Sequence, residues 1–170
     1  VDVSGRVNQL PFNYRPETSL TLSGLVDRNF TTLEAFEDDT LTGLSQYFLD
    51  EFSNEFRWDS NFRNSDFTLM AEVIFYLPSD IQPGTYDVAY APPENQKVPG
   101  GFMVGARLSY EDSAADIDFS ADSFTGTFTI TVDERNYANA TFEIVGTDNE
   151  TGESLTADGI FQYYESQFEG

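Results

Sequence analysis

The stretch from residue 124 to residue 164 constrains the fold most, because apolar and polar residues alternate along it almost without interruption. The first run places threonines between the apolar or small residues Phe124, Gly126, Phe128, Ile130 and Val132. Two further runs, over residues 138–144 and 155–163, follow polar turns. A period of two is typical of a strand with one buried and one solvated face. Three such strands joined by short turns predict an antiparallel meander.

The same alternation recurs in the rest of the chain. It is complete over residues 67–77, where both faces are partly apolar and a central strand is expected. Shorter runs occur at residues 1–7, 19–24, 86–90, 102–110 and 115–119. The chain has 170 residues, with 16 Phe and 9 Tyr, so residues 1–170 can bury an aromatic core as one domain. We predict an all-β fold, an antiparallel β-sandwich or flattened barrel of about nine or ten strands.

One segment has a different spacing. Apolar residues recur every three or four positions from Leu41 through Leu44, Phe48 and Phe52 to Phe56. This spacing predicts one α-helix near residues 40–56, packed on the sheet by its aromatic stripe. The polar residues that follow, up to residue 67, are expected to form a loop that leads into the central strand.

The charge of the chain excludes several classes of partner. The chain has 30 acidic and only 8 basic residues, so its formal net charge is −22. Such a surface repels phosphate backbones and anionic lipids, so we expect neither nucleic-acid binding nor adsorption to membranes. It suits a soluble protein in a salty environment, or a protein that binds cations.

Missing residue types exclude much chemistry. The chain contains no Cys and no His, which removes thiol nucleophiles, disulfides, imidazole bases and the commonest zinc ligands. A Ser-His-Asp triad is therefore impossible within this chain. Acidic residues are so numerous that pairs at a glycosidase separation arise by chance, so we predict that the protein is not an enzyme. The apolar runs are too short to span a bilayer, and no membrane insertion is expected. The first residue, Val1, is compatible with removal of an export segment.

Four motifs in the second half resemble a known group of proteins. They are Pro83-Gly84-Thr85-Tyr86, the strand from Thr125 to Thr131, Ala140-Thr141-Phe142 and Asp158-Gly159-Ile160-Phe161. In this order they resemble uncharacterised exported lipoproteins and secreted β proteins of bacteria, best known among the Bacteroidetes. The resemblance covers residues 67–164. It departs from the group's pattern at Ala140, where Gly is usual, and at Asp158, where Asn is usual, and no Cys is present to carry a lipid anchor. The resemblance implies a secreted β-sandwich, and it brings no active site with it.

A group of carboxylates suggests calcium. It consists of Glu111, Asp112, Asp116, Asp118 and Asp122. Calcium takes six to eight oxygen ligands, often carboxylates, and is the one possible cofactor we expect. No EF-hand spacing is present. The alternative interpretation is a solvated acidic edge that prevents edge-to-edge pairing of sheets.

An aromatic and arginine-rich segment suggests a glycan platform. Its candidate ligand-binding residues are Phe56, Trp58, Phe62 and Arg63. Aromatic rings among polar side chains can stack on sugars, and the alternative is that they cover an edge of the core. The acceptor pattern for N-glycosylation also occurs, at Asn29, Asn139 and Asn149.

The first residues suggest self-association. Val1, Val3 and Val7 lie on one side of an alternating segment that precedes Pro11 and Pro16. Such a segment could be added as a strand to a neighbouring subunit, giving a homo-oligomer, or it could be an ordinary first strand. Together these features predict a non-catalytic secreted or cell-surface protein. Its role would be structural assembly or binding, with glycan and calcium binding as alternatives.

Overall fold

The computed structural model describes residues 16–32, 41–50, 55–78, 81–91, 104–134 and 137–162. All its elements are strands, which confirms the predicted all-β class. They are β1 (Glu17–Gly24), β2 (Arg28–Thr31), β3 (Leu41–Asp50), β4 (Glu55–Asn64), β5 (Leu69–Leu77), β6 (Gly84–Tyr90), β7 (Val104–Asp112), β8 (Ile117–Ser120), β9 (Ser123–Val132), β10 (Ala138–Thr147) and β11 (Ser154–Gln162).

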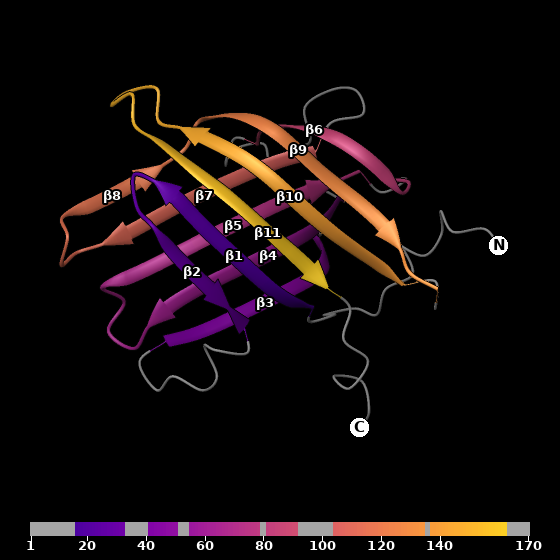
Figure 1. Cartoon of the computed structure of the whole chain (residues 1–170), viewed down its shortest axis with the longest axis horizontal. Helices are drawn as coiled ribbons and strands as arrows, with labels where there is room; N and C mark the ends of the chain where they lie inside the picture. The colour runs from indigo at the N-terminus through magenta and orange to yellow at the C-terminus, as the bar shows by residue number, and fades with distance from the viewer. Residues whose placement is uncertain are drawn as a thin grey trace.

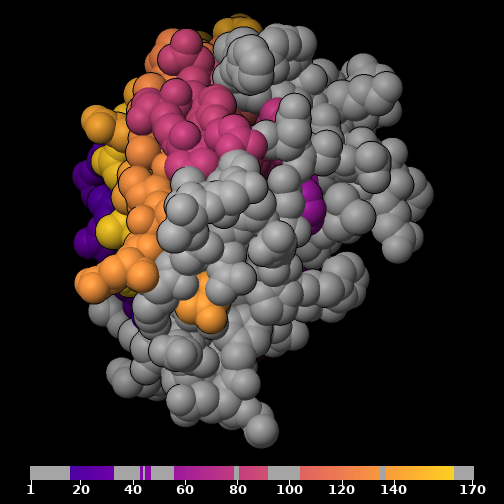
Figure 2. All heavy atoms as spheres, turned by 90° about the vertical axis from the view of Figure 1, so that its right-hand side faces the viewer, coloured from indigo at the N-terminus to yellow at the C-terminus, as the bar shows by residue number. Residues whose placement is uncertain are grey.

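The strands form one continuous mixed sheet that curls into a half-barrel (Figure 1). Its order is β2-β1-β11-β10-β9-β6-β7-β5-β4-β3, and β8 pairs with β7 outside this path. All pairs are antiparallel except β6–β7. Strand β6 joins the two halves, which face each other across the core, so the expected separation into two antiparallel sheets is not seen. In Figure 2, β6 lies toward the top, and β1 and the meander strands lie along one side.

The meander of β9, β10 and β11 has the predicted alternation. Strands β9 and β10 pair over ten residues without a break, and β10 and β11 over eight. Phe128 and Ile130 on β9, Phe142 on β10 and Phe161 on β11 are all buried. The inward position 159 of β11 is a glycine because an added Cβ would collide with the Phe142 ring and with the carbonyl oxygen of Ser19.

Aromatic rings from both halves of the sheet fill the core. The Trp58 ring of β4 stacks on Phe161 of β11 with centroids 5.0 Å apart, and Phe75 of β5 lies 4.5 Å from Phe128 of β9. Phe30 of β2 stacks on Phe62 of β4 at 5.1 Å. Offset and tilted ring pairs of this kind add about 0.5–1.5 kcal/mol each beyond the area they bury.

The prediction of a helix near residues 40–56 is wrong, and so is the loop after it. Strands β3 and β4 occupy residues 41–50 and 55–64, and they pair along their full ten residues. The inward positions of β3 include Gly43 and Ser45, which are small or polar, so this strand lacks an apolar alternation. Because β3 lacks that alternation, the accidental recurrence of Leu and Phe every three or four positions led to the wrong prediction of a helix.

The polar residue Ser45 is inward because it joins a buried hydroxyl cluster. The Thr18 hydroxyl of β1 donates to Ser45 Oγ at 2.6 Å. Ser60 Oγ of β4 lies 3.0 Å from Ser45 Oγ and 3.2 Å from Thr18 Oγ1. These contacts connect the two ends of the sheet across the interior. Each hydroxyl is satisfied, as buried polar groups must be.

Some predicted features lie elsewhere in the chain. The alternating segment of Val1, Val3 and Val7 falls outside the described residues, so the predicted assembly strand stays a prediction.

The short strand β2 was not predicted at all. Phe30 is the one buried apolar side chain among its four residues. A single apolar residue cannot show the alternation by which a strand is recognised in a sequence.

Candidate functional site

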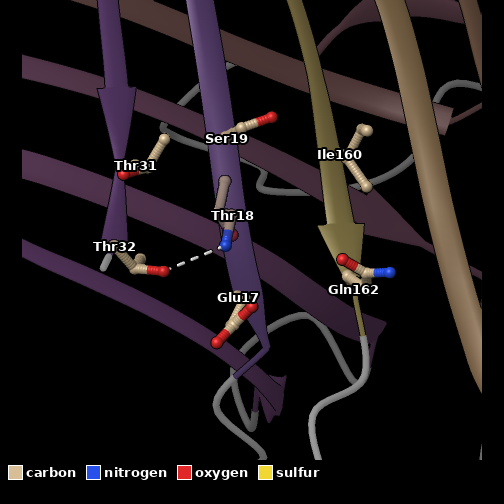
Figure 3. Close-up of a pocket in the computed structure, with 7 residues that line it drawn as sticks. All are labelled: Glu17, Thr18, Ser19, Thr31, Thr32, Ile160 and Gln162. Carbon is tan, nitrogen blue, oxygen red and sulfur yellow. Dashed lines mark hydrogen bonds between the residues drawn. The ribbon is translucent and has the colours of Figure 1, made fainter. Parts of the chain in front are cut away.

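A polar hollow lies on the outer face of the sheet, over β1, β2 and β11 (Figure 3). Its volume is about 330 Å³, and it is lined by Glu17, Thr18, Ser19, Thr31, Thr32, Ile160 and Gln162. The lining combines a carboxylate, an amide and several hydroxyls with one apolar side chain, Ile160. This isoleucine is 44% exposed, and with Phe67 it is one of two large apolar side chains exposed among the described residues.

The strand register places these side chains together. On neighbouring strands, Glu17 is directly opposite Gln162, and Ser19 is opposite Ile160. Ser19 is also opposite Thr31 of β2. Because directly opposite residues on antiparallel strands share a face, all of them point outward, away from the aromatic core. Thr18 points inward and closes one end of the hollow with its backbone N–H, which donates to Thr32 Oγ1 at 3.2 Å.

A second hollow adjoins the first and shares Ser19 and Ile160 with it. Its volume is about 420 Å³, and its lining is Ser19, Thr21, Phe142, Glu143, Asp158, Gly159 and Ile160. The two hollows together form one shallow depression across β2, β1, β11 and β10, which we call the outer groove. Ile160 stands at its centre, with polar side chains on both sides.

Asp158 is the least satisfied group in the outer groove. Its Oδ1 atom is buried and has no hydrogen-bond partner in the structure. Glu143 is directly opposite it on β10, so two carboxylates meet without a basic residue between them. Burial raises the pKa of Asp158 first of all, and the negative charge of Glu143 raises the pKa further. A ligand that donates a hydrogen bond to the carboxylate of Asp158 would stabilise its charged form and so oppose the effect of burial.

The predicted glycan platform does not form. Trp58 and Phe62 are buried in the core, and Phe56 packs against it. Only Arg63 lies on the outer face, where its guanidinium sits 4.3 Å from the centre of the Phe67 ring. Side chains two apart on a strand share a face, so residues 56, 58 and 62 point inward together and residue 63 points outward.

The five predicted calcium ligands do not converge. Asp112 is buried, and its Oδ2 atom lies 3.5 Å from Arg28 Nη2. Its Oδ1 atom accepts hydrogen bonds from the backbone N–H groups of Ala114 and Ala115. Asp122 accepts the N–H of Asn149 across the sheet at 2.9 Å.

The other three carboxylates lie apart from these. Glu111 is opposite Asp118 on the exposed side of the β7–β8 pair, and Asp116 lies in the turn before β8. Within the described ranges, no three acidic groups are close enough to hold a metal ion. Calcium binding stays a prediction.

A second polar cluster covers the outer face of β4, β5 and β7. Arg57 Nη2 lies 3.0 Å from Asp59 Oδ2, and Asn61 donates to Glu72 at 3.0 Å. Asp59 is 20% exposed, and burial raises its pKa to about 6, with a further contribution from Glu72 and opposing ones from Arg57 and Arg107. The two arginines therefore do not offset the burial of Asp59 and the charge of Glu72 completely.

Sequence reasoning missed the outer groove. Its residues belong to the polar faces of alternating strands, and these positions were assigned only to solvent. One signal was available, since Ile160 is an apolar residue in an otherwise polar row.

Comparison with known proteins gives no family for this chain: no family model, no curated protein and no solved structure matches it. The described part of the chain contains no helix with the length and apolarity that crossing a membrane requires.

Proposed function

We propose that this protein is a non-catalytic exported or cell-surface β module, and that it binds a neutral, hydroxyl-rich ligand such as a glycan in the outer groove. The observation that carries the proposal is the groove itself. Carboxylate, amide and hydroxyl groups converge there around one exposed aliphatic side chain. Shallow polar sites on rigid strands are suited to binding, because their geometry is set by the sheet.

The chemistry of the groove favours a sugar. Asp158 lines the second hollow, so a sugar hydroxyl can donate a hydrogen bond to its carboxylate. Gln162 and Glu17 can exchange paired hydrogen bonds with neighbouring hydroxyls, and Ile160 offers an apolar surface to the C–H face of a ring.

The charge of the site favours a neutral or cationic ligand over an anionic one. Three carboxylates, Glu17, Glu143 and Asp158, line the groove, and none of the described residues that line the two hollows is basic. The absence of Cys and His from the whole sequence further supports binding without covalent or imidazole-based catalysis. The export of the protein rests on the resemblance of residues 67–164 to secreted bacterial proteins.

Binding to a panel of neutral glycans tests the proposal. The wild-type protein is screened first, and the affinity for each hit is then measured by calorimetry for Asp158→Asn and Ile160→Thr. Asp158→Asn keeps the size of the side chain and removes its charge, and Ile160→Thr shortens the side chain and makes it polar but keeps a β-branched residue. We expect each to weaken binding at least about tenfold, the range typical for losing a hydrogen bond to a charged acceptor or an apolar contact.

Thr125→Ala is the matched control, since Thr125 is an exposed residue of β9 that lines neither hollow. It should bind like the wild type. No binding across the panel, or equal affinity in all four proteins, would rule out the groove as a glycan site. Turnover of any glycan would refute the non-catalytic assignment.

A further inference from the structure

The two ends of the curled sheet differ in how they are protected. Strand β2 ends one side with only four residues, and its first two, Arg28 and Asn29, are exposed and polar. Strand β3 ends the other side with ten residues in unbroken register with β4. Among the described strands, β3 has a neighbour on one side only. Natural sheets usually blunt their edges by short strands, charges or bulges, and β2 has the first two of these features.

As far as the described residues show, strand β3 is long and has no bulge. Its sequence is Leu-Thr-Gly-Leu-Ser-Gln-Tyr-Phe-Leu-Asp, so the only charged residue is the last one, Asp50. In a chain with a net charge of −22, a contact through this stretch brings few like charges directly together, and salt screens the repulsion between the rest of the two copies. A long and nearly uncharged edge is a template for pairing with another strand.

We propose that β3 is a homodimer interface, where the β3 strands of two copies pair antiparallel about a two-fold axis perpendicular to the sheet. This inference is independent of the outer groove, which lies on β1, β2, β10 and β11. A two-fold contact uses the same edge of both copies, so the assembly closes at two subunits.

The register of this contact follows from the faces of the strand. Residues that pair directly across antiparallel strands share a face, and the two-fold axis keeps the inner faces of both copies on the same side. The axis must therefore lie level with one residue of β3, so that this residue pairs with its own copy. It cannot lie level with the peptide bond between two residues. Ser45 or Gln46, the two central residues of β3, give the longest overlap. In the register centred on Gln46, the two copies of this residue are opposite each other, with Cα atoms about 4.5–5.5 Å apart.

Light scattering after size exclusion measures the mass. We expect a species of about 38 kDa, twice the 19.1 kDa of the chain, that dissociates on dilution. Gln46→Lys should make the protein monomeric, because it places two like charges beside the axis. Its fold should be retained, since Gln46 is opposite Asp59 of β4, which gives the new lysine an acidic neighbour. A mass of 19.1 kDa for the wild type at every concentration up to about 1 mM would overturn the proposal.

A single introduced cysteine locates the contact, because the natural chain has none. Gln46→Cys should give a disulfide-linked dimer if the axis passes beside residue 46. If it passes beside Ser45, the two cysteines lie about 8 Å apart, and a short bis-maleimide should join them. The control Thr125→Cys carries its cysteine on β9 and should stay uncrosslinked under both treatments.

Deletion of residues 1–7 separates this interface from the strand addition predicted from the first valines. The deletion should leave the dimer intact. If it abolishes the dimer while Gln46→Lys does not, the contact is a donated N-terminal strand, and the β3 interface is refuted. A dimer in which the Gln46→Cys variant crosslinks no better than the Thr125→Cys variant would refute it as well.

Discussion

The contribution of Asp59 to the stability of this protein should fall as the pH rises from about 4 to about 6. Burial is the first cause of its raised pKa, which lies at about 6 instead of 3.8, and the carboxylate of Glu72 is the second. A group with a raised folded pKa binds its proton more tightly in the folded state. Its contribution to stability is therefore complete below pH 3.8, where both states are protonated, and it is lost as the pH passes through the folded pKa.

The magnitude follows from the two pKa values. Each pH unit between them corresponds to about 1.4 kcal/mol, so the ionisation of Asp59 costs about 3 kcal/mol of unfolding free energy by pH 7. Asp59→Asn removes this titration. The difference in unfolding free energy between variant and wild type should therefore change by about 3 kcal/mol in favour of the variant between about pH 3.5 and pH 7. Comparing the two proteins cancels the contributions of the other carboxylates.

Urea unfolding followed by circular dichroism at a series of pH values measures this difference. Asp66→Asn provides a control of opposite sign. Hydrogen bonds from Thr68 lower the pKa of Asp66, so wild-type stability relative to that variant should rise with pH. A difference curve for Asp59→Asn that stays flat to within about 0.5 kcal/mol would refute the argument that burial of Asp59 opposes folding at neutral pH.

Three further predictions concern the core. Gly159→Ala should destabilise the fold by about 1–3 kcal/mol, because the new methyl group would collide with the Phe142 ring; thermal unfolding measures it, and an unchanged melting temperature would contradict it. Trp58→Ala should cost about 3–5 kcal/mol in urea unfolding followed by circular dichroism, since the ring is fully buried, and a loss under about 1 kcal/mol would show a solvent-exposed ring instead. Ser60→Ala should cost only about 1 kcal/mol in the same assay, because the two other hydroxyls of its cluster still bond to each other; a loss as large as that of Trp58→Ala would mean that the cluster acts as a unit.

The meander was predictable because its physics is local. Along β9, β10 and β11, one side of each strand is made of apolar or small residues and the other is mostly polar, so period alone gives the strand type, the buried face and the turns. Strand β5 was predictable for the same reason. Strand β3 was not, because its inward residues Gly43 and Ser45 are selected by neighbours far away in the chain.

The same difference between local pattern and distant contacts applies to the candidate sites. Trp58 is an aromatic residue among polar ones in the sequence, and the sequence contains nothing that says whether it faces a ligand or the core. Its stacking on Phe161, about a hundred positions later, decides this. The outer groove is the opposite case, because its residues do not suggest a site in the sequence. In the sequence Ser19 shows nothing unusual and Ile160 is only an apolar residue in a polar row, and the two become neighbours only when β1 pairs with β11.

By itself the sequence determined the all-β class, the faces of the alternating strands, the high negative charge and the absence of thiol and imidazole chemistry. These properties depend on the identity and spacing of residues close together in the chain. Only the tertiary structure decided that the strands form one curled sheet, that β3 ends it and that the outer groove lies over β1 and β11. Those features depend on which distant strands pair, and pairing is decided by the fit of side chains across the whole core.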